Sequence, residues 1–281
     1  MSKVKIINKK KRFITFALGV VLLTIFLASL ELVEFAGKDT AGNAQAYTIQ
    51  SVKQNSELVD GANEEKKKQE QTSSKKTAGK TVYLTFDDGP STLTGQFLDV
   101  LKEHDVKATF FMQGNNLNNT TFQENVKRTV QEGHYLGAHS MTHDHHKIYT
   151  NKQFVPEMKE TINLIRDITG VNSTLVRPPY GSAPGLKSKQ IRDEIVDAEM
   201  KIWDWTIDSE DWKLRDNPDK IVENIKEGTL RDVEVVLMHE KTQTLQALPA
   251  IINFYKERGY EFVAYDEDHH FSLNFQKDER L

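Results

Sequence analysis

The sequence predicts an α/β fold, a distorted parallel (β/α) barrel of about seven βα units. Three observations support this prediction. From residue 80 onward, short apolar runs alternate with longer stretches of helical period. This strand–helix order favours a parallel sheet, because parallel neighbours need a long crossover, usually a helix. Polar motifs also follow most of the apolar runs, as in barrels where the carboxyl ends of parallel strands converge on one face.

Each predicted strand is a short apolar run that precedes a helix-forming stretch. We expect strands at residues 82–86, 108–112, 135–139, 174–177, 201–207, 234–239 and 261–265. We expect helices at residues 92–104, 120–132, 151–169, 187–199, 218–227 and 243–258. The last helix has one apolar face, formed by Leu245, Leu248, Ile251, Ile252 and Tyr255.

The beginning of the chain has the pattern of a membrane anchor. Residues 1–12 carry five Lys and one Arg, and the 18 residues 13–30 carry no charge. At about 1.5 Å per residue, such a helix spans roughly 27 Å, close to the thickness of a bilayer core. We therefore expect a cytoplasmic tail at 1–12 and a single transmembrane helix at 13–33, since basic flanks stay inside. The alternative is a cleaved signal peptide, with Ala44-Gln45-Ala46 as the cleavage signal and a secreted product.

Composition separates the remainder into a stalk and a globular part. Residues 34–79 lack apolar periodicity and predict a disordered extracellular stalk. Residues 80–270 form the predicted globular domain, and 271–281 a C-terminal tail. Residues 1–79 hold 13 basic and 8 acidic side chains, whereas the rest of the chain holds 24 basic and 33 acidic ones. An acidic domain without a basic stripe argues against nucleic acid as a partner, and we expect a monomer.

Asp87 and Asp88 lie at the end of the first predicted strand, where Gly89-Pro90 turns the chain. Neighbours in a strand point to opposite faces, but at a bent strand end both can reach one cleft. Two adjacent carboxylates repel each other. A metal ion bound by one would compensate this repulsion and leave the other free as a base. The alternative interpretation is a solvated Asp-Asp-Gly turn.

His139 and His143 have i, i+4 spacing, so on a helical turn both imidazoles would point the same way. No Glu lies between them, and a base must therefore come from elsewhere. With Asp88 they would form an Asp-His-His ligand set that leaves one position open for water, as in catalytic zinc sites. These ligands also suit Co²⁺, Ni²⁺ or Mn²⁺. The absence of Cys excludes thiolate ligands and disulfides.

Several other polar and aromatic residues are also compatible with a purely structural role. Arg177 before Pro-Pro is also compatible with a surface ion pair, and His239 with a hydrogen-bonded core histidine. Among the tryptophans, we place Trp212 in the cleft and the others in the core. His145 and His146 are most simply surface residues, with substrate contact as the alternative.

Five motifs occur in order along residues 80 to about 270. They are Thr85-Phe-Asp-Asp-Gly89, His139-Ser-Met-Thr-His143, Arg177-Pro-Pro-Tyr-Gly181, Asp208-Ser-Glu-Asp-Trp212 and Leu237-Met-His239. Their order and spacing resemble those of the polysaccharide deacetylases, the NodB homology domain of carbohydrate esterase family 4. With its anchor and stalk, the chain most resembles the membrane-anchored peptidoglycan N-acetylglucosamine deacetylases of Gram-positive bacteria. At position 240 it has Glu, where many relatives carry Asp.

The resemblance implies one divalent metal ion, Zn²⁺ before Co²⁺, Ni²⁺ or Mn²⁺, bound by Asp88, His139 and His143. It implies that Asp87 is the general base and His239 the general acid.

For the other matched positions, the resemblance implies supporting roles. Asp211 would hold a charge network around Arg177 and Asp87, or orient His239. Tyr180 would offer its backbone N–H to the oxyanion, and Trp212 and Leu237 would line the sugar groove.

The reaction implied is hydrolysis of the N-acetyl group of GlcNAc in peptidoglycan. A bound cation would lower the pKa of its water, Asp87 would take the water proton, and His239 would protonate the departing amine. The basic residues before the apolar run place the domain outside the cell membrane, and the resemblance implies that it faces the cell-wall glycan. Alternatives are the same chemistry on N-acetylmuramic acid, poly-GlcNAc, chitin oligomers or acetylxylan. A non-catalytic wall-binding module and a glycosidase that uses Asp208 and Asp211 are two further alternatives.

Overall fold

The computed structural model describes residues 79–281, which form a parallel sheet with helices around it. The strand order is β5-β4-β3-β2-β1-β7-β6, and β8 pairs with β1 beside this path. The strands are β1 (Lys80–Gly89), β2 (Thr109–Met112), β3 (Tyr135–Ala138), β4 (Leu175–Val176), β5 (Lys201–Ile202), β6 (Ile207–Asp208), β7 (Val233–His239) and β8 (Tyr260–Phe262). The α/β class is confirmed. The sheet is a half-barrel, however, because β5 and β6 end the path without pairing with each other.

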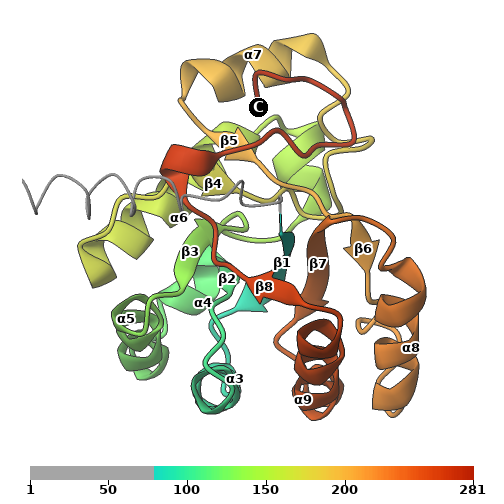
Figure 1. The fold of residues 1–281 in the computed structure, drawn as a ribbon. Helices are drawn as coiled ribbons and strands as arrows, with labels where there is room; N and C mark the ends of the chain where they lie inside the picture. Colours follow the sequence, from blue (N-terminus) through green and yellow to red (C-terminus); the bar gives the residue numbers. More distant parts are fainter. Residues whose placement is uncertain (1–78) are drawn as a thin grey trace, which may run out of the picture. The chain divides into compact units, whose positions relative to one another are not determined.

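All six predicted helices are present, with boundaries shifted by up to three residues. In Figure 1, α3 (Thr94–Glu103), α5 (Gln123–Gln131), α9 (Thr242–Glu257) and α8 (Pro218–Gly228) lie in a row along one side of the sheet. The helices α6 (Phe154–Thr169) and α7 (Lys189–Asp197) lie near β3, β4 and β5. The sequence did not predict the short segments α4 (Gly114–Leu117), η2 (His146–Thr150) and η3 (Glu267–His269), and η1 (Thr120–Phe122) forms the first three residues of the helix predicted at 120–132.

The strand predicted at 201–207 is wrong as a single strand. It consists of β5, which pairs with β4, and β6, which pairs with β7. Between them the chain crosses from one end of the sheet to the other. Accordingly, the N–H of Trp203 donates to Val176 O and that of Thr206 to Val235 O. The apolar run is continuous, but its two halves bond to different neighbours.

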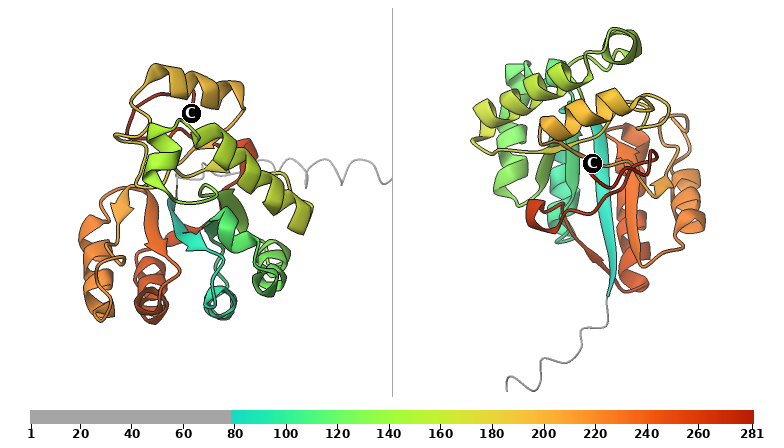
Figure 2. Two further views of the ribbon diagram at one scale, coloured as in Figure 1. Left: turned by 180° about the vertical axis from the view of Figure 1, so that it is seen from behind. Right: turned by 90° about the horizontal axis from the view of Figure 1, so that it is seen from above.

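Strand β1 lies in the middle of the sheet and places its side chains on two faces. Val82, Leu84 and Phe86 belong to the core that the sheet forms with α3, α5, α8 and α9. Tyr83 points to the other face and packs edge-on against Trp203, with ring centroids 5.0 Å apart. Because side chains alternate along a strand, Asp87 lies on the same inner face as Tyr83. Figure 2 shows β1 running beside β7, with which it pairs over seven residues.

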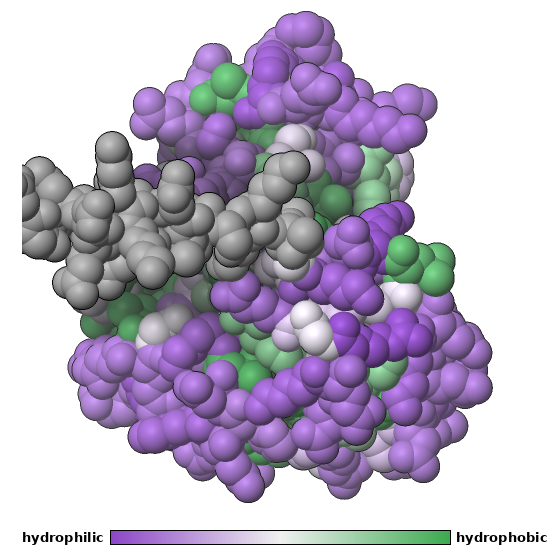
Figure 3. Space-filling model, in the orientation of Figure 1, coloured by the Kyte–Doolittle hydropathy of each residue, from purple (hydrophilic) through white to green (hydrophobic). Residues whose placement is uncertain are grey.

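Polar side chains cover most of the face that Figure 3 shows, and the hydrophobic patches on it are small. Among residues 79–281, no helix has both the length and the apolar composition that a bilayer span requires. The predicted tail, anchor and stalk at residues 1–12, 13–33 and 34–79 lie outside the described residues, apart from Gly79.

Candidate active site

Asp87 and Asp88 reach the same space because β1 is irregular at its end. The pairing of β1 with β2 shifts in register between Asp87 and Gly89, and Asp88 has a positive φ of 68°. This left-handed conformation breaks the alternation that would send the two carboxylates to opposite faces. As a result, His139 Nε2 lies 3.6 Å from Asp87 Oδ2 and 3.8 Å from Asp88 Oδ1.

The two histidines converge through a loop and not through a helical turn, which corrects the sequence prediction. His139 directly follows β3, and the chain then passes through Ser140 (φ 64°) and His143 (φ 56°). Ser140 Oγ accepts the N–H of His143 at 2.9 Å and closes this loop. His143 Nε2 lies 3.7 Å from Asp88 Oδ1, and the three side chains of Asp88, His139 and His143 can each place a ligand atom within 4.8 Å of the others.

The chemistry of these donors fits a divalent cation. His139 Nδ1 lies 2.8 Å from the carbonyl oxygen of Arg177, so its proton is held there and Nε2 is left as the ligand atom. Burial and the neighbouring His139 lower the pKa of His143, which favours the neutral imidazole. For Asp88, burial would raise the pKa, but His139, His239, His143 and Lys241 outweigh it and lower the pKa. A neutral imidazole and an ionised carboxylate are the forms that bind zinc.

Arg177 is a buried structural centre of the site, which excludes the surface ion pair considered from the sequence. Its guanidinium donates to Asp87 Oδ1 at 2.9 Å and to Thr85 Oγ1 at 2.6 Å. It also donates to the backbone carbonyls of Trp203 and Asp204. Arg177 therefore fixes one oxygen of Asp87 and leaves Oδ2 facing the histidines.

His239 ends β7 next to Asp87 in the sheet register. Asp211 Oδ1 lies 2.6 Å from His239 Nδ1, and Asp211 Oδ2 accepts the His239 N–H at 2.7 Å and the Thr244 hydroxyl. Of the two arrangements considered for Asp211, these contacts are those that orient His239. Burial would lower the pKa of His239, but the hydrogen bond and charge of Asp211, with Asp87 and Asp88, raise it.

The residues expected to contact substrate differ in exposure. Tyr180 and Trp212 are 57% and 55% exposed, whereas Leu237 on β7 is 5% exposed. The Tyr180 ring packs against His143, and its hydroxyl donates to the His143 carbonyl. His145 also lies against Tyr180, with centroids 5.7 Å apart, whereas His146 begins η2 with an exposed side chain.

Two buried acids near the site were not assigned roles from the sequence. Glu240 Oε2 accepts the hydroxyls of Ser91 and Thr94, and Oε1 has no hydrogen-bond partner among the described residues. Burial raises the pKa of Glu240. Asp204 has no predicted role, although a lone acid inside the apolar run 201–207 indicates that hydrogen-bond donors must pair with it.

The fold and the site are those of a hydrolase, with candidate metal ligands, a candidate base and a candidate acid near the carboxyl ends of one parallel sheet. The sequence profile of the polysaccharide deacetylases matches residues 74–206. A peptidoglycan-N-acetylglucosamine deacetylase of Bacillus cereus is 47% identical over 208 residues, which are 72% of this chain and 75% of that protein. The putative polysaccharide deacetylase YheN of Bacillus subtilis is 47% identical over 65% of this chain and 66% of its own length.

A solved structure shows the same fold. The crystal structure of the polysaccharide deacetylase Bc1974 from Bacillus cereus superimposes with a TM-score of 0.70 at 47% identity, covering 72% of this chain and all of that one. The chain belongs to the polysaccharide deacetylase family, the NodB homology domain of carbohydrate esterase family 4.

Proposed function

We infer that this protein removes the N-acetyl group of GlcNAc residues in peptidoglycan and releases acetate. The observation that carries this inference is the convergence of Asp88, His139 and His143 beside a separately held base, Asp87. The relatives support the substrate. The Bacillus cereus protein and PgdA of Listeria monocytogenes, the latter 37% identical over 40% of its length, are both named peptidoglycan-N-acetylglucosamine deacetylases.

Asp88, His139 and His143 would hold one divalent cation. Zn²⁺ suits a carboxylate and two imidazoles best, and Co²⁺, Ni²⁺ or Mn²⁺ also fit. A cation held by these residues would polarise the acetamide carbonyl and would lower the pKa of a water.

The chain's own residues perform the proton transfers. Asp87 accepts a proton from the attacking water through Oδ2, since Oδ1 is bonded to Arg177. A C–O bond forms as the water oxygen adds to the acetamide carbon. His239, protonated and held by Asp211, donates its proton to the nitrogen as the C–N bond breaks. The Tyr180 N–H stabilises the oxyanion, a contribution of a few kcal/mol, and the products are acetate and a free glucosamine amine.

The protein is further proposed to be a monomer bound to the cell membrane by one helix, with the domain facing the wall.

The glycosidase alternative is weaker. Asp208 Oδ1 accepts the N–H of Glu210, and Asp211 is bonded to His239, so this pair is not free for glycosidase chemistry.

Acetate release from purified peptidoglycan tests the proposal, with added zinc and with a chelator. Wild type should release acetate only with metal, and Asp88→Ala and His143→Ala should lose at least about 100-fold in rate. His269→Ala, an exposed histidine on η3, is the control and should keep wild-type activity. Acetate release from chitin oligomers, acetylxylan or N-acetylmuramic acid, without release from GlcNAc in peptidoglycan, would show that the substrate is one of these glycans. No acetate release from any glycan would contradict the proposal.

A further inference from the structure

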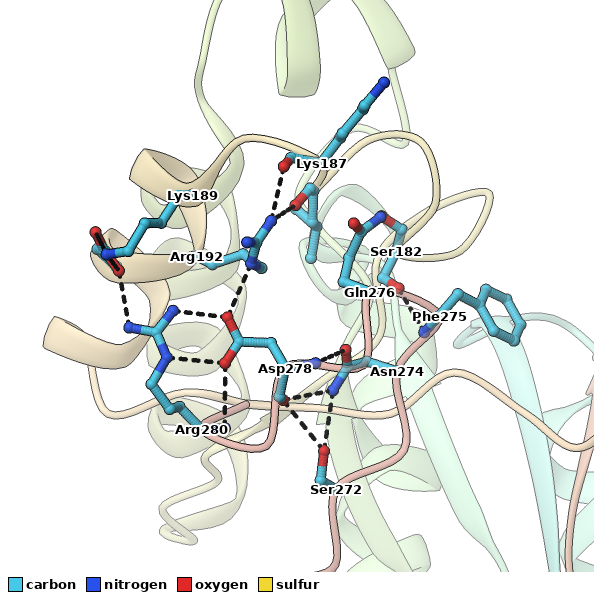
Figure 4. Close-up of polar contacts among 12 residues, drawn as sticks. Ser182, Lys187, Lys189, Arg192, Ser272, Asn274, Phe275, Gln276, Asp278 and Arg280 are labelled. Atoms are coloured by element: carbon cyan, nitrogen blue, oxygen red, sulfur yellow. Dashed lines mark hydrogen bonds and ion pairs between the residues drawn. The ribbon is translucent and has the colours of Figure 1, made fainter.

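Residues 271–281, here called the strap, run along β5 toward α7 (Figures 1 and 4). Leu273 pairs in parallel with Trp203, and its carbonyl accepts the N–H of Asp204 at 2.7 Å. The Trp203 indole donates to the carbonyl of Phe271 at 2.9 Å. The strap therefore bonds to the chain at the edge of the sheet where the half-barrel is open.

The carboxylate of Asp204 joins the strap to the loop that follows Arg177. It is fully buried and accepts three hydrogen bonds. They come from the Ser182 N–H at 2.8 Å, the Ser182 hydroxyl, and the Phe275 N–H at 2.6 Å. A buried carboxylate needs such donors, because an unpaired one is strongly destabilising. These bonds bring residues 182 and 275 to one point.

The strap also holds the other side of Ser182. Gln276 Nε2 donates to the Ser182 carbonyl at 2.8 Å, and the Phe275 N–H is shared with the Ser182 hydroxyl at 3.0 Å. The Phe275 ring lies so near Gly181 that a Cβ there would be 3.2 Å from it. Both backbone polar groups of Ser182 are thus held by Asp204 or the strap.

The held residues directly follow Tyr180, whose backbone is unusual. Tyr180 has φ 66° and Gly181 φ 81°. A residue with a side chain rarely takes a left-handed conformation unless its surroundings hold it there. The contacts of Asp204 and the strap with Gly181 and Ser182 supply such a constraint.

An outer set of contacts fastens the strap to α7, as Figure 4 shows. Asp278 accepts from Arg192 at 2.8 Å and from Arg280 at 2.6 Å, and Arg280 also reaches Asp193. Leu281 is buried in the same apolar cluster as Ile195. The strap is therefore anchored at both ends, at β5 and at α7.

We propose that Asp204 and the strap are positioning elements for deacetylation, which hold the Tyr180 N–H where the oxyanion develops. The proposal rests on the function inferred above. The candidate metal ligands come from the end of β1 and from the chain that follows β3, and within residues 79–281 none of them is hydrogen-bonded to the strap, although His143 contacts the side chain of Tyr180. Because an oxyanion donor acts mainly in the transition state, loosening the loop lowers kcat and leaves KM and metal binding nearly unchanged.

The first test is Asp204→Asn in the full chain. The amide keeps the shape of the side chain, but its NH₂ group cannot accept from Ser182 or Phe275. We expect kcat for peptidoglycan to fall by about 10- to 100-fold. KM should change by less than about threefold, with one zinc still bound in calorimetry. A kcat within about twofold of wild type, or a loss of zinc binding, would overturn the proposal.

A second pair of variants avoids a buried position. Gln276→Ala removes one donor to Ser182, and Glu279→Ala changes an exposed strap residue whose side chain has no hydrogen bond within residues 79–281. We expect kcat to fall about three- to tenfold for Gln276→Ala and to stay at the wild-type value for Glu279→Ala. Equal kcat values for the two variants would contradict the proposal.

Hydrogen exchange of the full chain separates this proposal from the proposed function. Peptides that cover residues 178–186 should exchange faster in Asp204→Asn and Gln276→Ala than in Glu279→Ala, while peptides of β1 and β7 stay unchanged. If wild type releases no acetate, the proposed function fails but this comparison still decides whether the strap orders the loop. Unchanged exchange in both variants would refute it.

Discussion

Asp87 and Asp88 are neighbours in the sequence but have different partners. Asp87 is buried and bonded to Arg177, whereas Asp88 is partly exposed and lies 3.7 Å from His143. Burying a charge is unfavourable unless it is paired and hydrogen-bonded. The guanidinium of Arg177 therefore holds the carboxylate of Asp87, whereas the carboxylate of Asp88 is available to a metal ion.

The contact between Asp211 and His239 predicts a specific pH dependence. The raised pKa of His239 keeps it protonated to higher pH than an ordinary histidine, and the acid is lost as the pH rises through this value. In Asp211→Asn the charge and the hydrogen bond to a carboxylate are removed, so the pKa falls. The alkaline limb of the pH profile of kcat/KM should therefore move to lower pH, and kcat should fall at least about tenfold.

The control for this prediction is Thr244→Val, which removes one hydrogen bond to Asp211 but no charge. It should move the alkaline limb less than Asp211→Asn does. If the limb stays in place in Asp211→Asn, His239 is not the group that controls it.

How well single residues could be predicted depended on their position. The aspartates, histidines and Arg177 were identified because polar residues stand out at the ends of apolar runs. Asp204 was not identified, because its partners Ser182 and Phe275 are 22 and 71 residues away in sequence and nothing local points to them. Glu240 was noticed, but its contacts with Ser91 and Thr94 follow from the approach of the β1 and β7 ends.

Helices and strands followed the apolar periodicity except where contacts between distant segments decided the outcome. The helices agree with prediction to within a few residues because each buries one regular face. The run 201–207 does not form one strand, because its first half pairs with β4 and its second half with β7. Whether a segment forms a strand depends on the strands beside it as well as on its own sequence. The loop from His139 to His143 likewise depends on two left-handed residues that spacing does not reveal.

Strand β3 offers a test of how closely the half-barrel is packed. A Cβ on Gly137 would lie 2.7 Å from the Phe111 ring and 2.9 Å from the carbonyl of Leu175. Gly137→Ala should lower the free energy of unfolding by about 1–3 kcal/mol, because the sheet cannot move away without strain. Urea unfolding measures this, with Gly79→Ala, which has no atom within 4 Å, as the control. Equal free energies of unfolding for the two variants would show that the sheet around Gly137 has room for a methyl group.

For the molecule as a whole, charge differs between the N-terminal region and the domain. Residues 1–79 are net basic and the rest net acidic. This pattern and the apolar run at residues 13–30 are the basis for the proposed membrane attachment.

Cell fractionation in a Gram-positive host tests the attachment. The full chain should remain in the membrane pellet after an alkaline wash, because an apolar helix stays in the bilayer. A variant that lacks residues 13–30 should be found in the soluble fraction. A shortened product in the culture medium, beginning after Ala46, would instead show that the segment is a cleaved signal peptide.

The length of β1 separates the start of the domain from the candidate site. The preceding chain joins β1 at Lys80, whereas Asp87 and Asp88 lie near the other end of the same strand. At about 3.3 Å per residue, these points are roughly 25 Å apart. The point at which the preceding chain joins the domain is therefore remote from Asp87 and Asp88, so a substrate that approaches these carboxylates does not meet Lys80.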